Sequence, residues 1–447
     1  MSTRLFKVST LAAVVLSTSV QADSLLDAVN ETLATNPEVL IRTTAADARG
    51  DEVTMARAGY LPRVDLTAGI GYENSRNSTT LANSGNTGSN DQSRTRRDAS
   101  LTARQMLFDG FAVNSEVDRQ KARQASAAQE VCSVASNTAL QVTRTYINVM
   151  RQQSVVELMK TNSAEHERVV ELIEKQGRKG RSNEADVAQA QSRRVLAKAN
   201  EISAESVLRD MKTQYQRLVG NLPSSYSLPE VPDNTPASLE SALKQGVNAH
   251  PVMKLASADV NAAEAQYDSS KSAYMPRFEL EVGANWDTDA NGGKGDTYNH
   301  VAKVNMTYNL FNGGGDKARR SQTSKLVNEA IEVRNRARRQ VEEEVRLAWV
   351  AVDFGVQRLV PLEDHVRQSG KSRELYNKQF LMGSRTLMDL LDSQNEFTTA
   401  RQSEINARYD LLFNQFRLLN STGSLLTALD ASLPVENDCG VKVVAAL

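Results

Sequence analysis

The chain carries one pattern twice, and this internal duplication limits its fold more than any other feature. Gly180 and Gly383 occupy equivalent positions 203 residues apart, within the stretches GRKGRSNEADVAQAQ and FLMGSRTLMDLLDSQ. Nearer the start, Pro62 and Pro276 are 214 residues apart, so the first copy carries one insertion of 11 residues. A period of about 200 residues excludes a solenoid built from short repeats. We therefore expect two structurally equivalent halves.

Five segments follow from this duplication. We predict a first structural repeat over residues 23–220 and a second over residues 238–423. Residues 221–237 hold four prolines and form a linker, and residues 424–447 form a C-terminal tail without clear periodicity. Residues 1–22 have the basic start, the short apolar core and the small-x-Ala end of a signal peptide. The mature chain is therefore expected to be exported.

Each repeat contains two stretches in which apolar and polar residues alternate. We predict strand pairs over residues 62–73 and 98–108 and over residues 277–287 and 300–311. Strands of about ten residues with one apolar and one polar face have the length and pattern of membrane-spanning β-strands. A soluble sheet with two unlike faces would show the same alternation. The strands of each pair are joined by polar loops, which are expected at the outer end of a membrane barrel.

Each strand pair is followed by a long helix and a returning helix. We predict these helices over residues 111–178 and 184–219 in the first repeat, and over residues 314–382 and 386–422 in the second. The first long helix contains no proline and would span roughly 100 Å at about 1.5 Å per residue. Apolar residues recur along it in steps of three and four, which is the seam of a coiled coil. Pro361 is expected to kink or split the second long helix.

Short tips join each long helix to its returning helix, and the second tip carries two acidic residues. Gly383 is suited to end the incoming helix because glycine accepts a left-handed backbone. Thr386 and Asp389 have the spacing of an N-terminal capping pair. Asp389 and Asp392 are three residues apart and share one helix face. Two interpretations stay open: Asp389 caps its helix while Asp392 faces water, or both carboxylates line a pore.

The composition excludes several classes of function. A net charge of −1 gives no electrostatic case for binding nucleic acid. The sequence has no nucleophile elbow, phosphate-binding loop or metal-ligand spacing, so we predict no enzyme activity, cofactor or metal. The sequence leaves open whether Cys132 and Cys439 form a disulfide. We expect the scattered histidines to be surface residues: His166, His250, His300 and His365.

Four amphipathic strands cannot close a barrel, and an open sheet edge is not tolerated in lipid. Other copies of the chain must therefore complete the sheet. Two copies would give eight strands with a filled interior, and three would give twelve strands around a water channel. Charges at Glu279, Glu281 and Lys303 on the polar face favour twelve. We predict an α+β membrane protein in which four strands per chain contribute to a 12-stranded trimeric β-barrel, continued by a long α-helical coiled-coil barrel.

Several stretches resemble the TolC family of outer-membrane channel proteins. They are the tandem halves, the YLP strand pair, the LFDG and LFNGG turns and the tip pattern Gly-x-x-x-Leu-x-Asp-Leu-Leu-Asp-x-Gln. The resemblance covers the chain from Asp23 to about Leu429, and RRQVEEEVRLAW and GSRTLMDLLDSQNE look like the AggA/LapE-type branch of type I secretion. It implies a homotrimer in the outer membrane of a Gram-negative bacterium, extending into the periplasm. It also implies an inner-membrane ABC transporter and a periplasmic adaptor as partners.

The resemblance and the shape of the tips together assign roles to individual residues. We predict a periplasmic gate and selectivity filter formed by Asp389 and Asp392. The tip latch is predicted to consist of Phe380 and an ion pair between Arg385 and Asp186. The family has tyrosine at the position of Phe380, so this chain has no hydroxyl for a lock there. The predicted surface on which the adaptor docks is formed by Lys179, Gly180, Arg181, Met382, Gly383 and Ser384.

Three functions are compatible with the sequence. In the first, the chain is the exit duct of a type I secretion system, in contact with outer-membrane lipid, and passes a protein substrate such as a large adhesin or an RTX-type protein. In the second, it is a small-molecule efflux channel coupled to a proton-driven pump. In the third, it is a soluble periplasmic coiled-coil scaffold. The third function leaves the four alternating strands unexplained.

Overall fold

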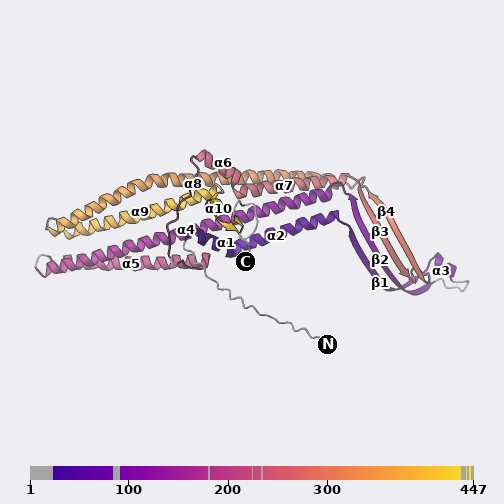
Figure 1. Cartoon of the computed structure of the whole chain (residues 1–447), viewed down its shortest axis with the longest axis horizontal. Coiled ribbons are helices and arrows are strands. Elements are labelled where there is room, and N and C mark those ends of the chain that lie inside the picture. Colours follow the sequence, from indigo (N-terminus) through magenta and orange to yellow (C-terminus); the bar gives the residue numbers. More distant parts are fainter. Residues whose placement is uncertain are drawn as a thin grey trace, which may run out of the picture.

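The computed structural model describes residues 24–83, 91–179, 182–223, 225–232, 235–433, 439 and 442–443. The predicted signal peptide lies outside these residues, as does most of the tail beyond residue 433. The molecule is elongated, with a four-stranded sheet at one end and the tips of two long helical hairpins at the other (Figure 1). None of the described helices combines the length and the apolar character needed to cross a membrane.

Four long helices form the body of the molecule. They are α4 (Ala112–Gly177), α5 (Glu184–Val219), α8 (Gly315–Leu381) and α9 (Leu387–Ser421). Helix α4 packs against both α5 and α9, and α9 also packs against α8, so that α5 and α8 lie at the two edges of the layer. Pro361 lies inside α8, which continues without a break, so the predicted split at this residue is wrong. One proline removes a single backbone hydrogen bond, and the packing of α8 against α9 along its length holds the remaining turns together.

Two pairs of shorter helices precede the strand pairs, one in each repeat. The first repeat begins with α1 (Leu25–Thr35), α2 (Pro37–Arg57) and the short turn η1 (Ala58–Tyr60). The second begins with α6 (Leu239–Ala249), α7 (Pro251–Lys271) and η2 (Ser272–Tyr274). In both repeats a proline opens the second helix of the pair, where its missing N–H is not needed. Helix α2 packs against α4, and α7 packs against α4 and α8.

The strands form one antiparallel sheet in the order β1-β2-β3-β4. Their bounds are β1 (Arg63–Ser75), β2 (Gln92–Phe108), β3 (Arg277–Thr288) and β4 (Asp296–Thr307). Strands β2 and β4 begin earlier than we predicted, at Gln92 and Asp296. The prediction missed these first residues because they are polar and show no apolar alternation. Their backbone nevertheless pairs with the neighbouring strands. The pairing of β2 with β3 joins the two repeats. Between β1 and β2, a short helix α3 (Ser78–Asn83) follows the first strand.

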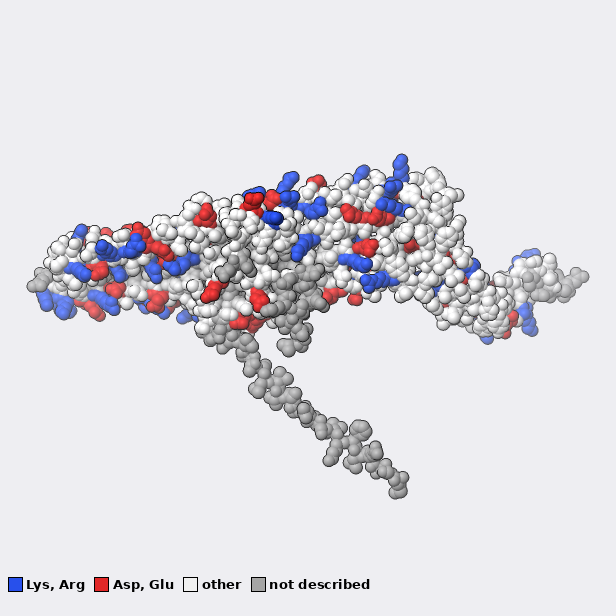
Figure 2. All heavy atoms as spheres, turned by 45° about the horizontal axis from the view of Figure 1, so that its top comes forward, with Lys and Arg blue, Asp and Glu red and all other residues white. Residues whose placement is uncertain are grey.

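The two faces of the sheet differ in polarity. On one face the large apolar side chains are highly exposed, as for Leu66 and Ile70, each 74% exposed. On the other face Arg104 of β2 contacts Glu281 of β3 at 3.3 Å and Asp65 of β1 at 3.7 Å. Figure 2 shows charged side chains scattered over the helical body and few over the middle of the sheet. An exposed apolar face of this extent needs a covering of lipid or protein.

The largest hydrophobic core lies at the middle of the molecule, where α1, α4, α5, α9 and the start of the tail meet. Tyr146, Tyr215 and Phe416 are completely buried in it. The hydroxyl of Tyr146 accepts a hydrogen bond from the backbone N–H of Ser227 at 2.9 Å, so this core also fixes the linker. The last elements are α10 (Leu425–Ala428), β5 (Ser432–Leu433) and β6 (Lys442–Val443).

A disulfide ties the tail to this core, which settles the question that the sequence left open. Cys132 of α4 and Cys439 are bonded, and they are 307 residues apart in the chain. Cys132 is 1% exposed. A disulfide is expected to persist in an exported protein because the compartment is oxidising.

Replacing both cysteines with serine should lower the midpoint of thermal unfolding in detergent. A cross-link that closes a long loop restricts the unfolded chain, and its removal typically costs about 2–5 kcal/mol. Addition of a reductant should lower the midpoint of the wild-type protein and leave that of the double variant unchanged. Equal midpoints for both proteins, with and without reductant, would show that the bond does not stabilise the fold.

Candidate functional site: the helix-hairpin tips

The tips of both hairpins lie at the same end of the molecule (Figure 1). They share one hydrophobic core. The second hairpin contributes Phe380 from α8 and three leucines from α9, all buried. The first hairpin contributes Val170 and Ile173 from α4 and Ala190 from α5. We refer to these seven residues as the tip core: Val170, Ile173, Ala190, Phe380, Leu387, Leu390 and Leu391. The tip core holds the two hairpins together where they end.

The turn of the second tip is built around Gly383. Its φ angle is +79°, in the left-handed region that favours glycine. The backbone N–H of Ser384 donates to the carbonyl of Gln379 at 3.0 Å, and that of Gly383 donates to the carbonyl of Phe380 at 2.9 Å. These bonds satisfy the last carbonyls of α8. A Cβ atom added at Gly383 would meet nothing within 4 Å, so the turn presents open surface at the end of the molecule.

Asp389 caps α9, as one of our two interpretations stated. The hydroxyl of Thr386 donates to the Asp389 carboxylate at 2.8 Å, and the backbone N–H of Thr386 donates to it at 3.1 Å. In return, the backbone N–H of Asp389 donates to the Thr386 hydroxyl at 3.2 Å, which completes a capping box. The bonds from Thr386 hold the pKa of Asp389 below its ordinary value. The carboxylate therefore stays ionised, and supports the cap, until the pH falls through that lowered pKa.

The second acidic residue is placed differently. Asp392 is exposed, one turn further along α9, and it forms no ion pair with any residue that the structure describes. It lies between Leu391, which belongs to the tip core, and the buried Ser393. Its carboxylate is therefore free to face water, a pore or another chain. The capping role of Asp389 does not exclude a role in a gate, because the same carboxylate remains 37% exposed.

Arg385 is held within its own hairpin. Its Nε donates to the side-chain oxygen of Gln379 at 3.0 Å, and its guanidinium lies 4.3 Å from the centroid of the Tyr376 ring. Its Nη1 is 3.9 Å from the Asp389 carboxylate. The predicted ion pair between Arg385 and Asp186 does not form within the single chain. Asp186 is half-buried at the start of α5, where its backbone N–H bonds to Asn183. A latch between these two residues across chains stays a prediction.

Phe380 packs inside the tip core, where it is 8% exposed. Its role in a latch stays a prediction. The aromatic hydroxyl at this tip belongs to Tyr376, one helical turn earlier, which we did not predict. The sequence offered one signal for it, because Tyr376 precedes Phe380 by four residues and so lies on the same face of α8.

The predicted adaptor-docking residues that the structure describes are all exposed. Lys179 lies just after α4, and Met382, Gly383 and Ser384 form the end of the second tip. Gly180 and Arg181 lie outside the described residues. Two further apolar side chains that we did not predict extend this surface: Leu381 and Met388, which are 57% and 44% exposed. Met388 also accepts a hydrogen bond at its Sδ from Gln189 of α5, so it bridges the two tips.

Between the tips and the sheet, polar contacts join the two hairpins along α4 and α9. Arg151 contacts Asp410 at 2.7 Å, and the hydroxyls of Ser154 and Tyr409 are 3.0 Å apart. Closer to the tips, the Thr398 hydroxyl donates to Asn162 at 3.0 Å. We refer to these three pairs as the hairpin seam. Polar pairs of this kind contribute less than an apolar core and can exchange with water.

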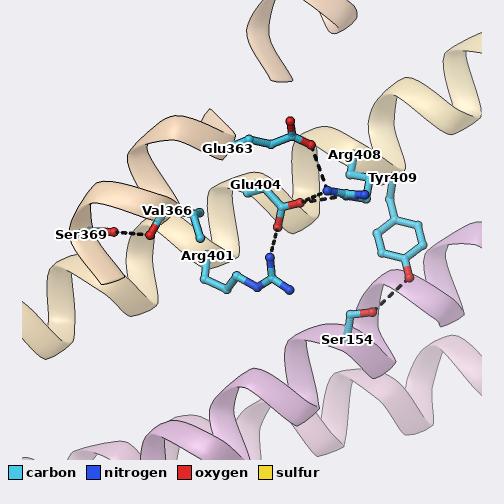
Figure 3. A network of polar contacts seen from close by, with 8 residues as sticks. All are labelled: Ser154, Glu363, Val366, Ser369, Arg401, Glu404, Arg408 and Tyr409. Carbon is cyan, nitrogen blue, oxygen red and sulfur yellow. Dashed lines mark hydrogen bonds and ion pairs between the residues drawn. The ribbon is translucent and has the colours of Figure 1, made fainter. Parts of the chain in front are cut away.

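The second hairpin has its own ionic cluster beside the seam (Figure 3). Glu404 is 2% exposed and accepts from Arg401 at 2.8 Å and from Arg408 at 2.8 Å. Arg408 also reaches Glu363 of α8 at 3.0 Å, so it links α8 to α9. A buried carboxylate with two arginine partners is fully paired, and loss of either partner would be costly. The cluster therefore ties α8 to α9 within the second hairpin.

Two of the four histidines are not surface residues, contrary to our expectation. His166 of α4 is 7% exposed and His250 is 8% exposed, whereas His300 and His365 are exposed. His250 caps α7 by accepting from the backbone N–H of Val252 at 3.2 Å, and burial lowers its pKa to about 4. Burial also lowers the pKa of His166, with a smaller contribution from Arg193. Among the described residues, no group of three or more His, Cys, Asp or Glu side chains is placed to hold a metal ion.

Comparison with known proteins gives a consistent result. The family model described as "Outer membrane efflux protein" matches residues 28–221 and 242–424. The chain is 24% identical to the outer membrane protein TolC of Vibrio cholerae, covering 92% of this chain and 93% of the relative. It is 22% identical to the proteases secretion protein PrtF of Dickeya chrysanthemi, covering 97% of each. Among solved structures, the fold is similar to that of CusC, with a TM-score of 0.77, 15% identity and 92% of each chain covered.

Proposed function

Because the chain belongs to the outer membrane efflux protein family, we propose that it is the outer-membrane exit duct of a type I secretion system. Members of this family are outer-membrane channels that extend into the periplasm, and they are not enzymes. TolC-family channels are homotrimers that work with an adaptor and an inner-membrane transporter. The proposal adds the kind of transporter, an ABC transporter, and the kind of substrate, a protein.

The open edges of the single chain support a trimeric duct. Strands β1 and β4 are the outer strands of the sheet, and α5 and α8 are the outer helices of the layer. Exposed apolar side chains line both outer helices, as for Val195 on α5 and Phe354 and Val360 on α8, which are 61%, 62% and 64% exposed. When three chains join edge to edge, twelve strands close with the polar face inside and the exposed apolar face towards lipid. A continuous helical tube then leads from the barrel to the tips.

The similarity to PrtF supports protein secretion over the efflux of small molecules. PrtF is a proteases secretion protein, and it matches this chain over 97% of both lengths. The alternative function, efflux of small molecules with a proton-driven pump, is supported by the description of the family and uses the same fold. The two functions differ in what fails when the gene is deleted. Loss of a large secreted protein with unchanged sensitivity to drugs supports the proposal, and the reverse result supports efflux.

The two acidic residues of the second tip are proposed as the gate and selectivity filter. In a trimer, each chain would bring Asp389 and Asp392 to the narrow end of the tube. The cap lowers the pKa of Asp389, so its carboxylate is charged at neutral pH. Asp392 is exposed and unpaired among the described residues. Rings of acidic side chains attract cations and repel anions. The tip would therefore select cations and bind multivalent metal ions that block the channel.

The double variant Asp389→Asn, Asp392→Asn tests this filter, because the side-chain oxygen of an asparagine at residue 389 can still accept from the backbone N–H of Thr386 but carries no charge. In a planar bilayer, the variant should lose the cation preference of the wild-type channel and its block by trivalent metal ions. The variant Asp296→Asn provides a control at the opposite end of the molecule, since it removes a carboxylate from the start of β4 and leaves both tip carboxylates in place. If the double variant keeps both properties, the carboxylates only stabilise the tip.

The adaptor is proposed to dock on the end of the tips. This surface combines apolar side chains with an open turn. Met382 is 74% exposed, and a Cβ atom added at Gly383 would meet nothing within 4 Å. Lys179 adds a positive charge from the first tip, and the proposal extends to Gly180 and Arg181 of the same tip. A rigid turn with exposed apolar neighbours suits a helical partner that packs against it.

Replacing Gly383 with tryptophan should abolish secretion while the trimer still assembles, because the bulky side chain would cover the docking surface. Gly295, in the loop between β3 and β4, is the matched control. It also has a positive φ angle and open space around it, but it lies at the other end of the molecule. The Gly295→Trp variant should secrete normally. Normal secretion by the Gly383 variant would remove the tip from the docking surface.

A further inference from the structure

The apolar face of the sheet carries aromatic side chains at both of its ends. Near the loops, Trp286 of β3 lies opposite Tyr298 of β4, and Tyr72 of β1 lies at the same end. These three side chains are 36%, 67% and 76% exposed. Near the helices, the rings of Phe108 and Phe278 are 6.5 Å apart. Aromatic rows at both ends of an apolar band are typical of the two interfaces of a membrane.

The row near the loops faces the cell exterior, because the helices extend into the periplasm from the other end of the sheet (Figure 1). We refer to Tyr72, Trp286 and Tyr298 as the outer aromatic row. Trp286 lies eight positions after Phe278 along β3. At about 3.3 Å per residue and a tilt of about 40°, this corresponds to roughly 20 Å across the membrane, close to the height of the apolar band in membrane barrels.

Arg97 of β2 lies within the outer aromatic row. Its direct partners in the sheet are Ile70 on β1 and Thr288 on β3, which places it on the apolar face. Its neighbours on β2 show how it is flanked: Thr95 lies opposite Tyr72, and Ala99 lies opposite Trp286. The two aromatic side chains are therefore the diagonal neighbours of Arg97, within reach of a long side chain.

The charge of Arg97 is not balanced by the protein. Arg96 and Arg104 of the same strand lie on the polar face, where they contact the carboxylates of Asp287 at 3.4 Å and Glu281 at 3.3 Å. Arg97 is exposed, and its side chain has no ion pair or hydrogen bond with any residue in the described part of the chain. The carboxylate in the same row is that of Asp296, two strands away, and it accepts a hydrogen bond from Thr288 at 2.5 Å.

A guanidinium on the lipid-facing side of a barrel must find its partner in the membrane. Arginine stays charged at all relevant pH values. Such a charge is costly at the midplane of the membrane and much less costly near its interfaces. The position of Arg97 in the outer aromatic row therefore places its charge at the depth of the lipid head groups. The anion available there is phosphate, which a guanidinium binds with two parallel hydrogen bonds.

We propose that Arg97, flanked by Tyr72 and Trp286, forms a binding site for a phosphate group of lipid A, the phosphorylated glycolipid of the outer leaflet. Each chain contributes one such site, so a trimer would carry three around its outer surface. The two rings border the site and contact the apolar part of the lipid, while Arg97 holds the head group. The site would fix the height of the barrel in the outer leaflet and would not depend on what the duct transports.

The test uses the purified full-length trimer in detergent and native mass spectrometry to count bound lipid. The probe is lipid A with both phosphates, compared with the same lipid after enzymatic removal of its phosphates. Wild-type protein should bind the phosphorylated lipid roughly tenfold more tightly or better, as expected for a charge-assisted bidentate contact. Equal binding of both lipids to the wild-type protein would overturn the proposal without any variant.

The variants Arg97→Gln and Arg94→Gln, which each remove one positive charge, locate the site. Arg97→Gln should weaken binding of the phosphorylated lipid by about tenfold or more, and Arg97→Lys should restore part of it because lysine contacts phosphate as a single charge. Arg94→Gln removes an arginine three residues away on the opposite face of β2 and should bind like the wild type. Wild-type binding by Arg97→Gln, or an equal loss in Arg94→Gln, would contradict the assignment. Equal binding of phosphatidylglycerol would overturn the choice of the glycolipid.

Discussion

The structure depends on one constraint: backbone groups at the edge of a sheet cannot remain unpaired in lipid. Strands β1 and β4 each expose one such edge, and the single chain has no element that covers it among the described residues. The helical layer repeats this arrangement, with α5 and α8 as edges that carry exposed apolar residues. Each layer can therefore be completed by the opposite edge of another copy. Edge-to-edge joining of this kind is heterologous and gives a closed ring when the rotation closes.

The tips show how stability and function can share the same side chains. Asp389 is required for the capping box of α9, and its carboxylate is still partly exposed. Phe380 and the leucines of the tip core keep the two hairpins together, whereas the hairpin seam above them consists of polar pairs. Beside these pairs, Ile405 of α9 belongs to one hydrophobic cluster with Val155, Val156 and Met159 of α4. Apolar contacts therefore join the two hairpins at the tip core and again further along α4 and α9.

The sequence predicted the main elements because their patterns are strong and local. Alternation gave the four strands, and the absence of glycine and proline gave the first long helix. Features that depend on where side chains lie in three dimensions were not predicted, even where the partners are close in the chain. Arg385 pairs with Gln379 and Asp389 of its own hairpin, Tyr376 lies under it, and His250 is buried as a helix cap. The bond between Cys132 and Cys439 likewise needs the tail to return to α4, which no local pattern indicates. Pro361 is tolerated because neighbouring helices support α8.

The mass of the particle extracted in mild detergent tests the central claim most directly. If both edges of the chain are completed by other copies, native mass spectrometry should find three chains of the mature protein in each particle. The same particles should conduct ions when they are inserted into a planar bilayer. A single chain that remains folded in detergent and does not conduct would contradict the account, because its sheet edges would then be stable without a partner.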